Sequence, residues 1–510
     1  MFAVTVNSNL LGERLDAGFY RPTFLSMEKA LREKGAVRLE TLVDSVACGP
    51  FGGNAIADDL YARDGVAFIR PVNISSHVFD DSSLVRVPKK NLAANGLKIY
   101  QGTNIYFGRV GDPCVAIIEG ESSISPNIII ACTKGDLADP YYIYSFAASS
   151  FGLQQLKRQL KTVAQPTTST DAIRELLVFK PENAAQKYIG DKVRQAERLR
   201  ALGKKLSGKL EGAVEAIFAG NPRPLKAHRS HVSKDMLLEK RLDAEFYSPE
   251  SLWAESEITK SKYGFAPLGN LATRIKDGPG GWGVSTNDYQ ESGVPVIRSV
   301  NIVDGECDLS DCVYISEKKH QDLISHEAKR GCVLLSVRGT IGRAAVFTDR
   351  YYRVASLNAA VVTIDCKDEI NPYFLAAFLN SPIGKIQANR IANGAVQLNM
   401  NLTETASNLV VTPPQTIQDA IAEIYKAKIE AKNASKHLTT VAKLLVEALI
   451  EGQLTEAELI AAEQALQAGN DQLDRRILNR LKTDGVDGEG PALFGDLDEL
   501  YRLLTQAEED

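Results

Sequence analysis

Features that mark several common functional classes are absent from this 510-residue sequence. No apolar run approaches the roughly 18 residues that a membrane-spanning helix needs, so we expect no membrane partner. The N-terminus has neither a basic start nor a long apolar region, so we expect no secretory signal and a cytoplasmic protein. The seven cysteines are scattered without a C-x-x-C pair, and the six histidines form no cluster. This pattern predicts reduced thiols and no metal site.

Sequence motifs for catalysis are also missing. There is no G-x-x-x-x-G-K-[ST] phosphate loop, and no glycine-rich turn between a strand and a helix that would bind S-adenosylmethionine. D-P-Y-Y at 139–142 and N-P-Y-F at 371–374 come close to the D/N-P-P-Y/F motif of adenine methyltransferases but lack the second proline. Asp or Asn before proline is typical of a helix start. We therefore predict a protein that is not an enzyme, with no catalytic residue and no cofactor of its own.

The sequence does contain an internal repeat, in which the same motifs occur twice in the same order. Three anchor motifs recur with an offset that grows only from 227 to 232 residues. Each half therefore carries the same succession of elements, with a few residues inserted. The anchors are R-L-D-A-x-F-Y at 14–20 and 241–247, G-V-x-x-I-R-x-V-N-I at 65–74 and 293–302, and V-E-A-x-x-x-G at 214–220 and 446–452.

Each half is predicted to be a mixed α/β domain that ends in a long helix. Short β-branched runs between glycine turns indicate strands. Apolar residues at steps of three and four, from about 184 to 219 and from about 416 to 451, indicate proline-free helices. About 35 residues span roughly 50 Å. A small domain cannot bury so long an apolar seam, so we expect the two helices to pair with each other.

The sequence thus predicts an α+β fold with two duplicated domains, two long antiparallel coiled-coil helices and a helical C-terminal tail. The tail holds 14 acidic and 5 basic residues, so the rest of the chain, unlike the whole, is mildly basic. Such a body suits phosphate binding. For the tail, a docking segment and a cap that completes the fold both remain open. The expected boundaries are 1–183 for domain 1, 184–220 for its helix, 221–235 for a linker, 236–415 for domain 2, 416–452 for its helix and 453–510 for the tail.

This layout resembles the DNA specificity subunit of type I restriction–modification systems over about residues 12–452. G-C-V-L-L-S-V-R-G-T-I-G at 331–342 is similar to the family's G-D-V-L-x-S-x-R-G-T-I-G turn. G-P-G-G at 278–281 is similar to its glycine-rich loop, and Q-L-N at 397–399 to the segment before its returning strand. The first half departs from the pattern, with G-R-V-G-D-P at 108–113 and Q-P-T at 165–167.

The resemblance implies two target recognition domains that read the two parts of a split DNA sequence, held by paired spacer helices. It implies a subunit without catalytic residues, whose partners are double-stranded DNA, two methylation subunits and restriction subunits. S-adenosylmethionine is then expected on the methylation subunit. The residues also leave open a coiled-coil scaffold whose heads bind other proteins in a related phage-defence system.

Candidate DNA contacts are the polar side chains in the loops of each half, because donors and cations read base edges and phosphates. An arginine and an asparagine recur at equal spacing, as Arg70 with Asn73 and Arg298 with Asn301, although a matched pair can equally be structural. Trp282 could stack on DNA or pack within its domain. The remaining candidates are Asn54 in a glycine-rich loop, Arg109, Arg338, Thr340 and Arg343 on glycine turns, and Lys161, Thr167, Arg390, Asn393, Gln397 and Asn399 in polar segments.

Overall fold

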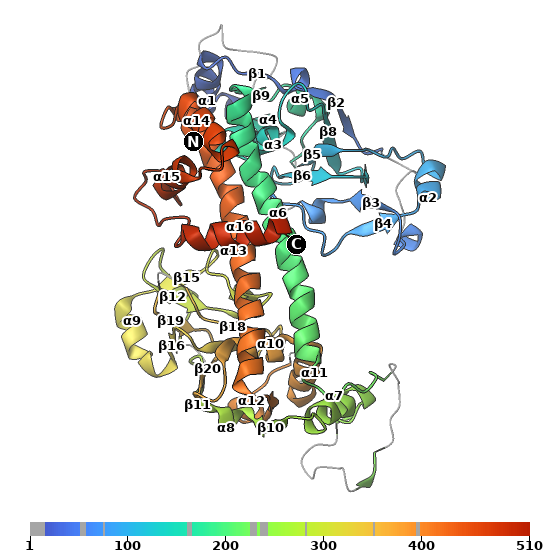
Figure 1. Cartoon of the computed structure of the whole chain (residues 1–510), viewed down its shortest axis with the longest axis vertical. Helices are drawn as coiled ribbons and strands as arrows, with labels where there is room; N and C mark the ends of the chain where they lie inside the picture. The colour runs from blue at the N-terminus through green and yellow to red at the C-terminus, as the bar shows by residue number, and fades with distance from the viewer. Residues whose placement is uncertain are drawn as a thin grey trace. The chain divides into compact units, whose positions relative to one another are not determined.

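In a computed structural model, the chain divides into two compact units, each containing one of the repeated domains (Figure 1). The first comprises residues 1–199 and 433–510, and the second residues 200–432. No described helix is long and apolar enough to cross a membrane, and the described residues contain no His, Cys, Asp and Glu group that could hold a metal ion. The structure describes residues 16–50, 58–74, 77–160, 166–224, 232–234, 243–280, 283–349, 352–393 and 398–509.

In the first unit, two small sheets enclose an aliphatic core. One sheet has the antiparallel strand order β2-β8-β5-β6, and the other has the order β4-β3-β7, with β3 parallel to β7. Ile69, Tyr106 and Ile130 come from both sheets and share one buried cluster, as expected for β-branched and aromatic residues on pleated surfaces. The strands are β2 (Val43–Cys48), β3 (Val66–Ile69), β4 (Val85–Val87), β5 (Thr103–Gly108), β6 (Val115–Glu119), β7 (Ser122–Ile124) and β8 (Ile128–Thr133).

The second unit repeats this arrangement and adds one edge strand. Its sheets have the orders β11-β20-β17-β18 and β15-β12-β19-β16, with β12 parallel to β19. The common strand order confirms the duplicated α+β fold that the sequence repeat predicted. The strands are β11 (Ala272–Asp277), β12 (Val294–Ile297), β15 (Val313–Ile315), β16 (Ala328–Lys329), β17 (Val333–Ser336), β18 (Ala344–Val346), β19 (Val354–Leu357) and β20 (Val361–Cys366).

Helices and a two-stranded ribbon complete each domain at matched positions. In both domains an N-terminal helix contacts the second helix of a helical pair. The ribbons join β1 to β9 and β10 to β21. These elements are α1 (Pro22–Glu33), α3 (Pro140–Ala147), α4 (Ser150–Gln159), β1 (Val37–Arg38) and β9 (Leu177–Val178) in the first unit, and α7 (Pro249–Thr259), α10 (Pro372–Asn380), α11 (Pro382–Ile391), β10 (Gly264–Pro267) and β21 (Leu409–Thr412) in the second.

The two long helices form where the apolar periodicity placed them, as α6 (Asn183–Glu215) and α13 (Gln415–Glu451). Each compact unit contains part of both helices. The first unit contains the N-terminal half of α6 and the C-terminal half of α13, and the second unit contains the other two halves. In the second unit, Leu210 and Val214 of α6 share a buried cluster with Ile421 of α13 and with α10. The predicted seam is buried at Ile189, Val193, Ala196, Leu199, Leu202, Leu206, Leu210, Ile217, Ile421, Ala431, Leu438, Val441, Leu445 and Leu449.

Each domain is fastened to its long helix by the same glutamine contact. Gln186 of α6 accepts a hydrogen bond from the Asp139 N–H (3.0 Å) and donates one to the Pro181 carbonyl (2.7 Å). Gln418 of α13 accepts from the Asn371 N–H (2.9 Å) and donates to the Pro413 carbonyl (3.0 Å). Both amides are buried, so each bonds backbone groups that water cannot reach.

The acidic tail folds within the first unit. It consists of α14 (Glu456–Gln467), α15 (Gln472–Arg480), a short hairpin and α16 (Leu497–Glu509). Asp474 of α15 pairs with Lys192 of α6 at 2.6 Å, and both side chains are at most 2% exposed. Tyr188 of α6 donates to the same carboxylate at 2.5 Å. A buried ion pair of this kind makes the tail part of the unit's core, as in the cap alternative.

Candidate nucleic-acid interface

Loops from several strands of the second unit meet at one edge of its domain. The Ile297 carbonyl at the end of β12 accepts a hydrogen bond from Asn358 N (2.9 Å), in the connection between β19 and β20. The Val337 N–H, at the end of β17, donates to the Ala360 carbonyl of that connection (2.9 Å). The connection thus joins the turn after β12 to the turn after β17. No motif marked it in the sequence.

The glycine-rich loop after β11 reaches the same edge. Gly278 N donates to the Val361 carbonyl (3.0 Å), and a Cβ at Gly278 would lie 2.3 Å from the Asn358 carbonyl oxygen. No side chain fits so close an approach, which explains the glycine at this position. We call this region loop edge 2; it comprises residues 278–280, 298–301, 338–343, 358–360 and 398–400.

The first unit has an equivalent loop edge. Ser125 N donates to the Ile69 carbonyl (2.9 Å), and Arg109 N donates to the Asn127 carbonyl (3.0 Å). A Cβ at Gly49 would lie 2.2 Å from the Ser125 carbonyl oxygen, as at Gly278. Loop edge 1 comprises residues 49–50, 70–73, 108–111, 125–127 and 166–168.

At each edge the glycine turn pairs with the returning polar segment. In the second unit, Arg338 bridges to Asn399, and the Arg338 Nε donates to the Asn399 Oδ1 at 3.0 Å. Asn399 also exchanges backbone hydrogen bonds with Asn393, at 2.7 and 2.8 Å. In the first unit, Val110 bridges to Thr167, and the Thr168 N–H donates to the Arg109 carbonyl at 2.8 Å. The structure therefore brings together candidates that lie about sixty residues apart in each half.

A serine beneath the turn holds its shape in the second unit. The Ser336 hydroxyl donates to the Thr340 carbonyl and accepts from the Arg343 N–H at 3.1 Å. Gly342 adopts a φ of 82°, where a side chain would be strained. Arg338 and Thr340 are exposed, while Arg343 is half-buried. The turn thus presents one cation and one hydroxyl to solvent on a fixed backbone.

The matched asparagines build the turns after β3 and β12. Asn73 and Asn301 are 0% and 2% exposed. Each accepts from the backbone N–H of the arginine three residues earlier at 3.0 Å. Each donates to a carbonyl seven residues later, also at 3.0 Å. The prediction of base contact by Asn73 and Asn301 is therefore wrong, because their amides are buried and already bonded.

The arginines of these pairs also have partners inside their domains. The Arg70 Nη2 donates to the Ser83 carbonyl at 2.6 Å, and the Arg298 Nη2 donates to the Asp311 carbonyl. These bonds tie each turn to the loop that follows it. A guanidinium has five N–H groups, so phosphate contact by the remaining groups of Arg70 and Arg298 stays a proposal.

Asn301→Ala is expected to destabilise the second unit by about 2–3 kcal/mol, because it leaves buried backbone groups without partners. The measurement is thermal unfolding followed by tryptophan emission, since both tryptophans of the chain fall within residues 200–432. Asn73→Ala, the same change in the first unit, is the control and should leave this transition in place. An unshifted transition in Asn301→Ala would contradict the structural role.

Arg390 is a second correction, because it packs inside the domain. Its side chain is 9% exposed, pairs with Glu255 at 2.9 Å and donates through Nε to the Phe246 carbonyl at 2.9 Å. The guanidinium lies 4.1 Å from the centre of the Phe246 ring. Arg158 makes the matching contacts with Phe19 in the first unit. The predicted DNA contact of Arg390 is therefore wrong, since burial and these bonds occupy the cation.

The remaining candidates are Asn393, Thr167 and four residues that the structure does not describe. Asn393 is exposed, and its amide donates to the Glu404 carboxylate. Thr167 is half-buried beside the Arg109 turn. Four candidates lie outside the residues that the structure describes: Asn54, Lys161, Trp282 and Gln397.

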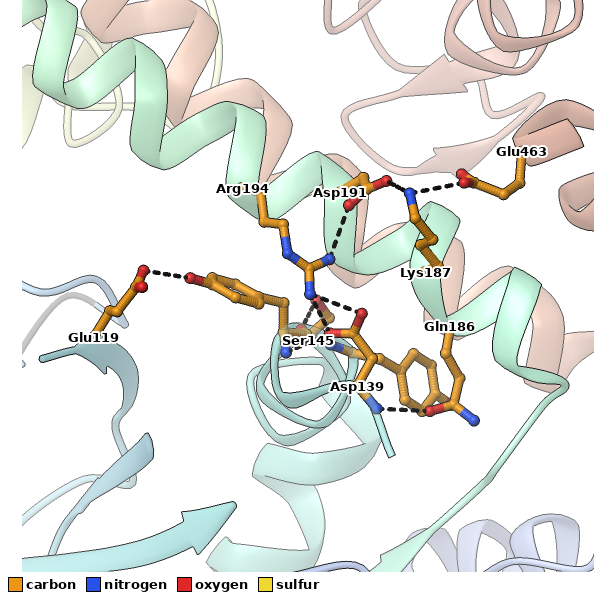
Figure 2. A network of polar contacts seen from close by, with 10 residues as sticks. Glu119, Asp139, Ser145, Gln186, Lys187, Asp191, Arg194 and Glu463 are labelled. Carbon is orange, nitrogen blue, oxygen red and sulfur yellow. Dashed lines mark hydrogen bonds and ion pairs between the residues drawn. The ribbon is translucent and has the colours of Figure 1, made fainter. Parts of the chain in front are cut away.

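The D-P-Y-Y segment, which resembled a methyltransferase motif, is a helix cap. The Asp139 Oδ1 accepts from the Tyr141 N–H at 2.8 Å, and Arg194 of α6 donates to both carboxylate oxygens, at 2.9 and 3.0 Å (Figure 2). The guanidinium of Arg194 lies 4.3 Å from the centre of the Tyr141 ring. These bonds use the carboxylate as the predicted helix cap, and they also fasten α3 to α6, which the sequence did not indicate.

The tyrosines of this segment are likewise engaged. Tyr142 is fully buried and donates to the Phe179 carbonyl at 2.5 Å. Burial, with the nearby Glu119 carboxylate, raises the pKa of the Tyr141 hydroxyl to about 12. The Tyr141 hydroxyl therefore stays protonated at neutral pH and donates to Glu119 (3.3 Å), a contact drawn in Figure 2.

Three solved structures are similar to this chain at low sequence identity. The type I restriction–modification S subunit from M. genitalium matches with 12% identity and a TM-score of 0.44, over 82% of this chain and 95% of that chain. A structure from a study of complex assembly in the type I R-M system has 14% identity, a TM-score of 0.30 and coverages of 82% and 97%. The HsdS subunit from Thermoanaerobacter tengcongensis has 14%, 0.27, 82% and 96%. No protein-family model and no curated protein sequence matches the chain.

Proposed function

We propose that this protein is the non-catalytic DNA specificity subunit of a type I restriction–modification complex. Each unit contributes one recognition domain, and each domain reads one half of a bipartite DNA target. The observation that carries the proposal is the loop edge, which the chain builds twice from matched strands. An edge of loops on a rigid sheet is suited to recognition, because the scaffold fixes side chains that must meet a ligand.

The exposed chemistry of the edges fits a nucleic acid. At loop edge 2, Arg338 and Thr340 are exposed beside Asn399, and these side chains supply a cation, a hydroxyl and an amide. Phosphates and base edges require such groups. Loop edge 1 carries the half-buried Arg109 and Thr167, and Val110 bridges to Thr167 where Arg338 bridges to Asn399 in loop edge 2. Similar scaffolds with different donors are what two different half-sites require.

The long helices supply the second part of the proposal. Because α6 and α13 each contribute to both units, we propose that they set the spacer between the half-sites and dock the methylation subunits. S-adenosylmethionine would bind those partners, of which two are expected, and restriction subunits would complete a cytoplasmic complex. The scaffold alternative explains the helices, but it gives no reason for two matched loop edges, one of which exposes a cation at Arg338.

The test is to express the chain with its methylation subunits and to sequence the methylated positions of the host DNA. The proposal expects one bipartite motif, lost when this chain is omitted. Purified complex should then bind a duplex carrying that motif more tightly than a scrambled duplex of equal length. Equal binding of both duplexes would favour the scaffold instead.

Arg338→Ala is expected to weaken binding of the complex by about 1.5–3 kcal/mol, the usual contribution of a hydrogen bond to a charged group, on the motif and on a scrambled duplex alike. We assign Arg338 to a phosphate, so the slope of log K against log salt should also fall by about one. Lys260→Ala, which removes an exposed cation after α7, is the matched control and should leave the slope unchanged. An unaltered slope in Arg338→Ala would remove this residue from the interface.

A further inference from the structure

Each loop edge displays one exposed valine at the same position of the repeat. Val72 is 50% exposed and Val300 is 61% exposed, among the few large apolar side chains that the described surface leaves open. They lie in the short 3-10 turns Pro71–Asn73 and Ser299–Asn301, directly after β3 and β12. Single exposed apolar residues are ordinary on protein surfaces, but this pair occupies matched positions.

The turns hold these valines outward by construction. The residue after each valine is the buried asparagine, whose oxygen accepts from the arginine N–H two residues before the valine. The arginine then ties the turn to the next loop. A β-branched side chain has few rotamers, so a contact made by valine on such a turn loses little conformational entropy.

The fold gives no reason for valine at either position. The buried clusters include Ile69 and Ile74 in the first unit, and Ile297 and Ile302 in the second, but neither valine. The arginine and the asparagine recur because they build the turn. The valine recurs although it adds no buried contact, so we look for its partner outside the chain.

The place of the valines identifies that partner. Val300 follows Ile297, whose carbonyl bonds Asn358, and the same connection bonds the Arg338 turn. Val72 follows Ile69, which bonds Ser125 in the corresponding connection of loop edge 1. Both valines therefore belong to the loop edges, and loop edge 2 also exposes the cation Arg338. Among the base-edge groups of the major groove, the apolar one is the thymine C5-methyl.

We propose that Val300 and Val72 are specificity-determining residues, each making an apolar contact with the methyl group of one thymine in its half-site. This inference rests on the proposed DNA-binding function. It assigns a T·A pair to each half-site and gives the valine, rather than the buried asparagine, the reading role at this turn.

The experiment measures binding of the complete complex to a series of duplexes. In each duplex, a single thymine of one half-site is replaced by deoxyuridine, so that every thymine is tested in turn. For the wild type, removal of one methyl group at one position is expected to weaken binding about three- to tenfold. Val300→Ser should show the same loss on the thymine duplex and no further loss on the uracil duplex. Its salt slope should equal that of the wild type, because no charge is removed. Val72→Ser should behave likewise at the other half-site.

The controls separate this inference from the function on which it rests. Phe265→Ser removes another exposed apolar side chain, which is 43% exposed. Phe265 lies on β10, before the start of β11, whereas loop edge 2 begins after the end of β11. This variant should leave DNA binding unchanged. If the wild-type complex fails to prefer its motif, the proposed function is wrong. If it prefers the motif but Val300→Ser remains sensitive to the same uracil, or if neither half-site contains a T·A pair, only the valine assignment is wrong.

Discussion

Asp474→Asn should release the C-terminal tail and destabilise the first unit by about 3–5 kcal/mol, the usual cost of breaking a buried ion pair from one side. Asp474 and Lys192 are almost completely buried, and Tyr188 and Tyr501 donate to the same carboxylate. Burial alone would raise the pKa of Asp474, but Lys192 and the two hydroxyls hold it below its ordinary value. The neutral amide leaves the Lys192 ammonium buried without its counter-charge.

The chain offers a direct measurement of this effect. Thermal unfolding followed by far-ultraviolet circular dichroism should begin at a lower temperature, and amides of α15 and α16 should exchange faster. The tryptophan emission transition should stay in place, because both tryptophans fall in the second unit. Glu508→Gln breaks an exposed pair with Arg198 and should change stability by less than about 1 kcal/mol. Equal amide exchange in Asp474→Asn and wild type would refute the role of this ion pair.

The same carboxylate sets an acid limit on the tail. A group whose pKa is lowered by folding stabilises the native state above its unfolded pKa, and that contribution is lost as the pH falls through the folded value. The unfolded value for Asp is about 3.9. The stability difference between wild type and Asp474→Asn should therefore be full at pH 6 and shrink below about pH 4.

Lengthening both long helices by seven residues should abolish binding to the original DNA target. We place the insertions after Leu199 in α6 and after Lys432 in α13, where the boundaries of the compact units fall, so that the contacts within each unit are kept. Seven residues add about 10 Å, the length of roughly three base pairs. With one half-site out of reach, affinity should fall by at least a hundredfold, because each unmatched base pair costs about 1–3 kcal/mol.

The readout of this variant is the methylated motif in the host. Any motif that remains should have a longer spacer and unchanged half-sites, because the recognition domains are untouched. The unchanged half-sites serve as the internal control for folding of both domains. A motif with the original spacer would show that the helices do not set the distance.

Local chemistry made the helices and the repeat predictable. The seam of α6 has an apolar residue every three or four positions, and Asp139 and Asn371 precede prolines at helix starts; both signals lie within a few neighbouring residues. The Arg338 turn and the segment around Asn399 were singled out by motifs that resembled a known family, but their pairing was not predicted. These parts of the fold and of the loop edge were accessible because each depends on a local pattern.

Burial decided what the sequence could not. Polar residues in a loop indicate available donors, but Arg390 finds its carbonyl acceptor at Phe246, 144 residues away. Asn301 is buried beneath its own turn, and no local sequence pattern indicates that burial. The partner of Asp474 is 282 residues distant, so the sequence predicted a helical tail but not its place. Errors of this kind arise because tertiary partners, rather than residue type, determine which polar groups meet solvent.

The C-terminal tail also makes the two repeats of the chain structurally different. In the first unit it covers Tyr188 and Lys192 of α6. The matching stretch of α13 in the second unit leaves Asp419, Ala420 and Glu423 exposed. A partner that bound the same stretch of both long helices would find it covered by the tail in α6, but exposed and acidic in α13. The two repeats therefore present different surfaces of their long helices to solvent.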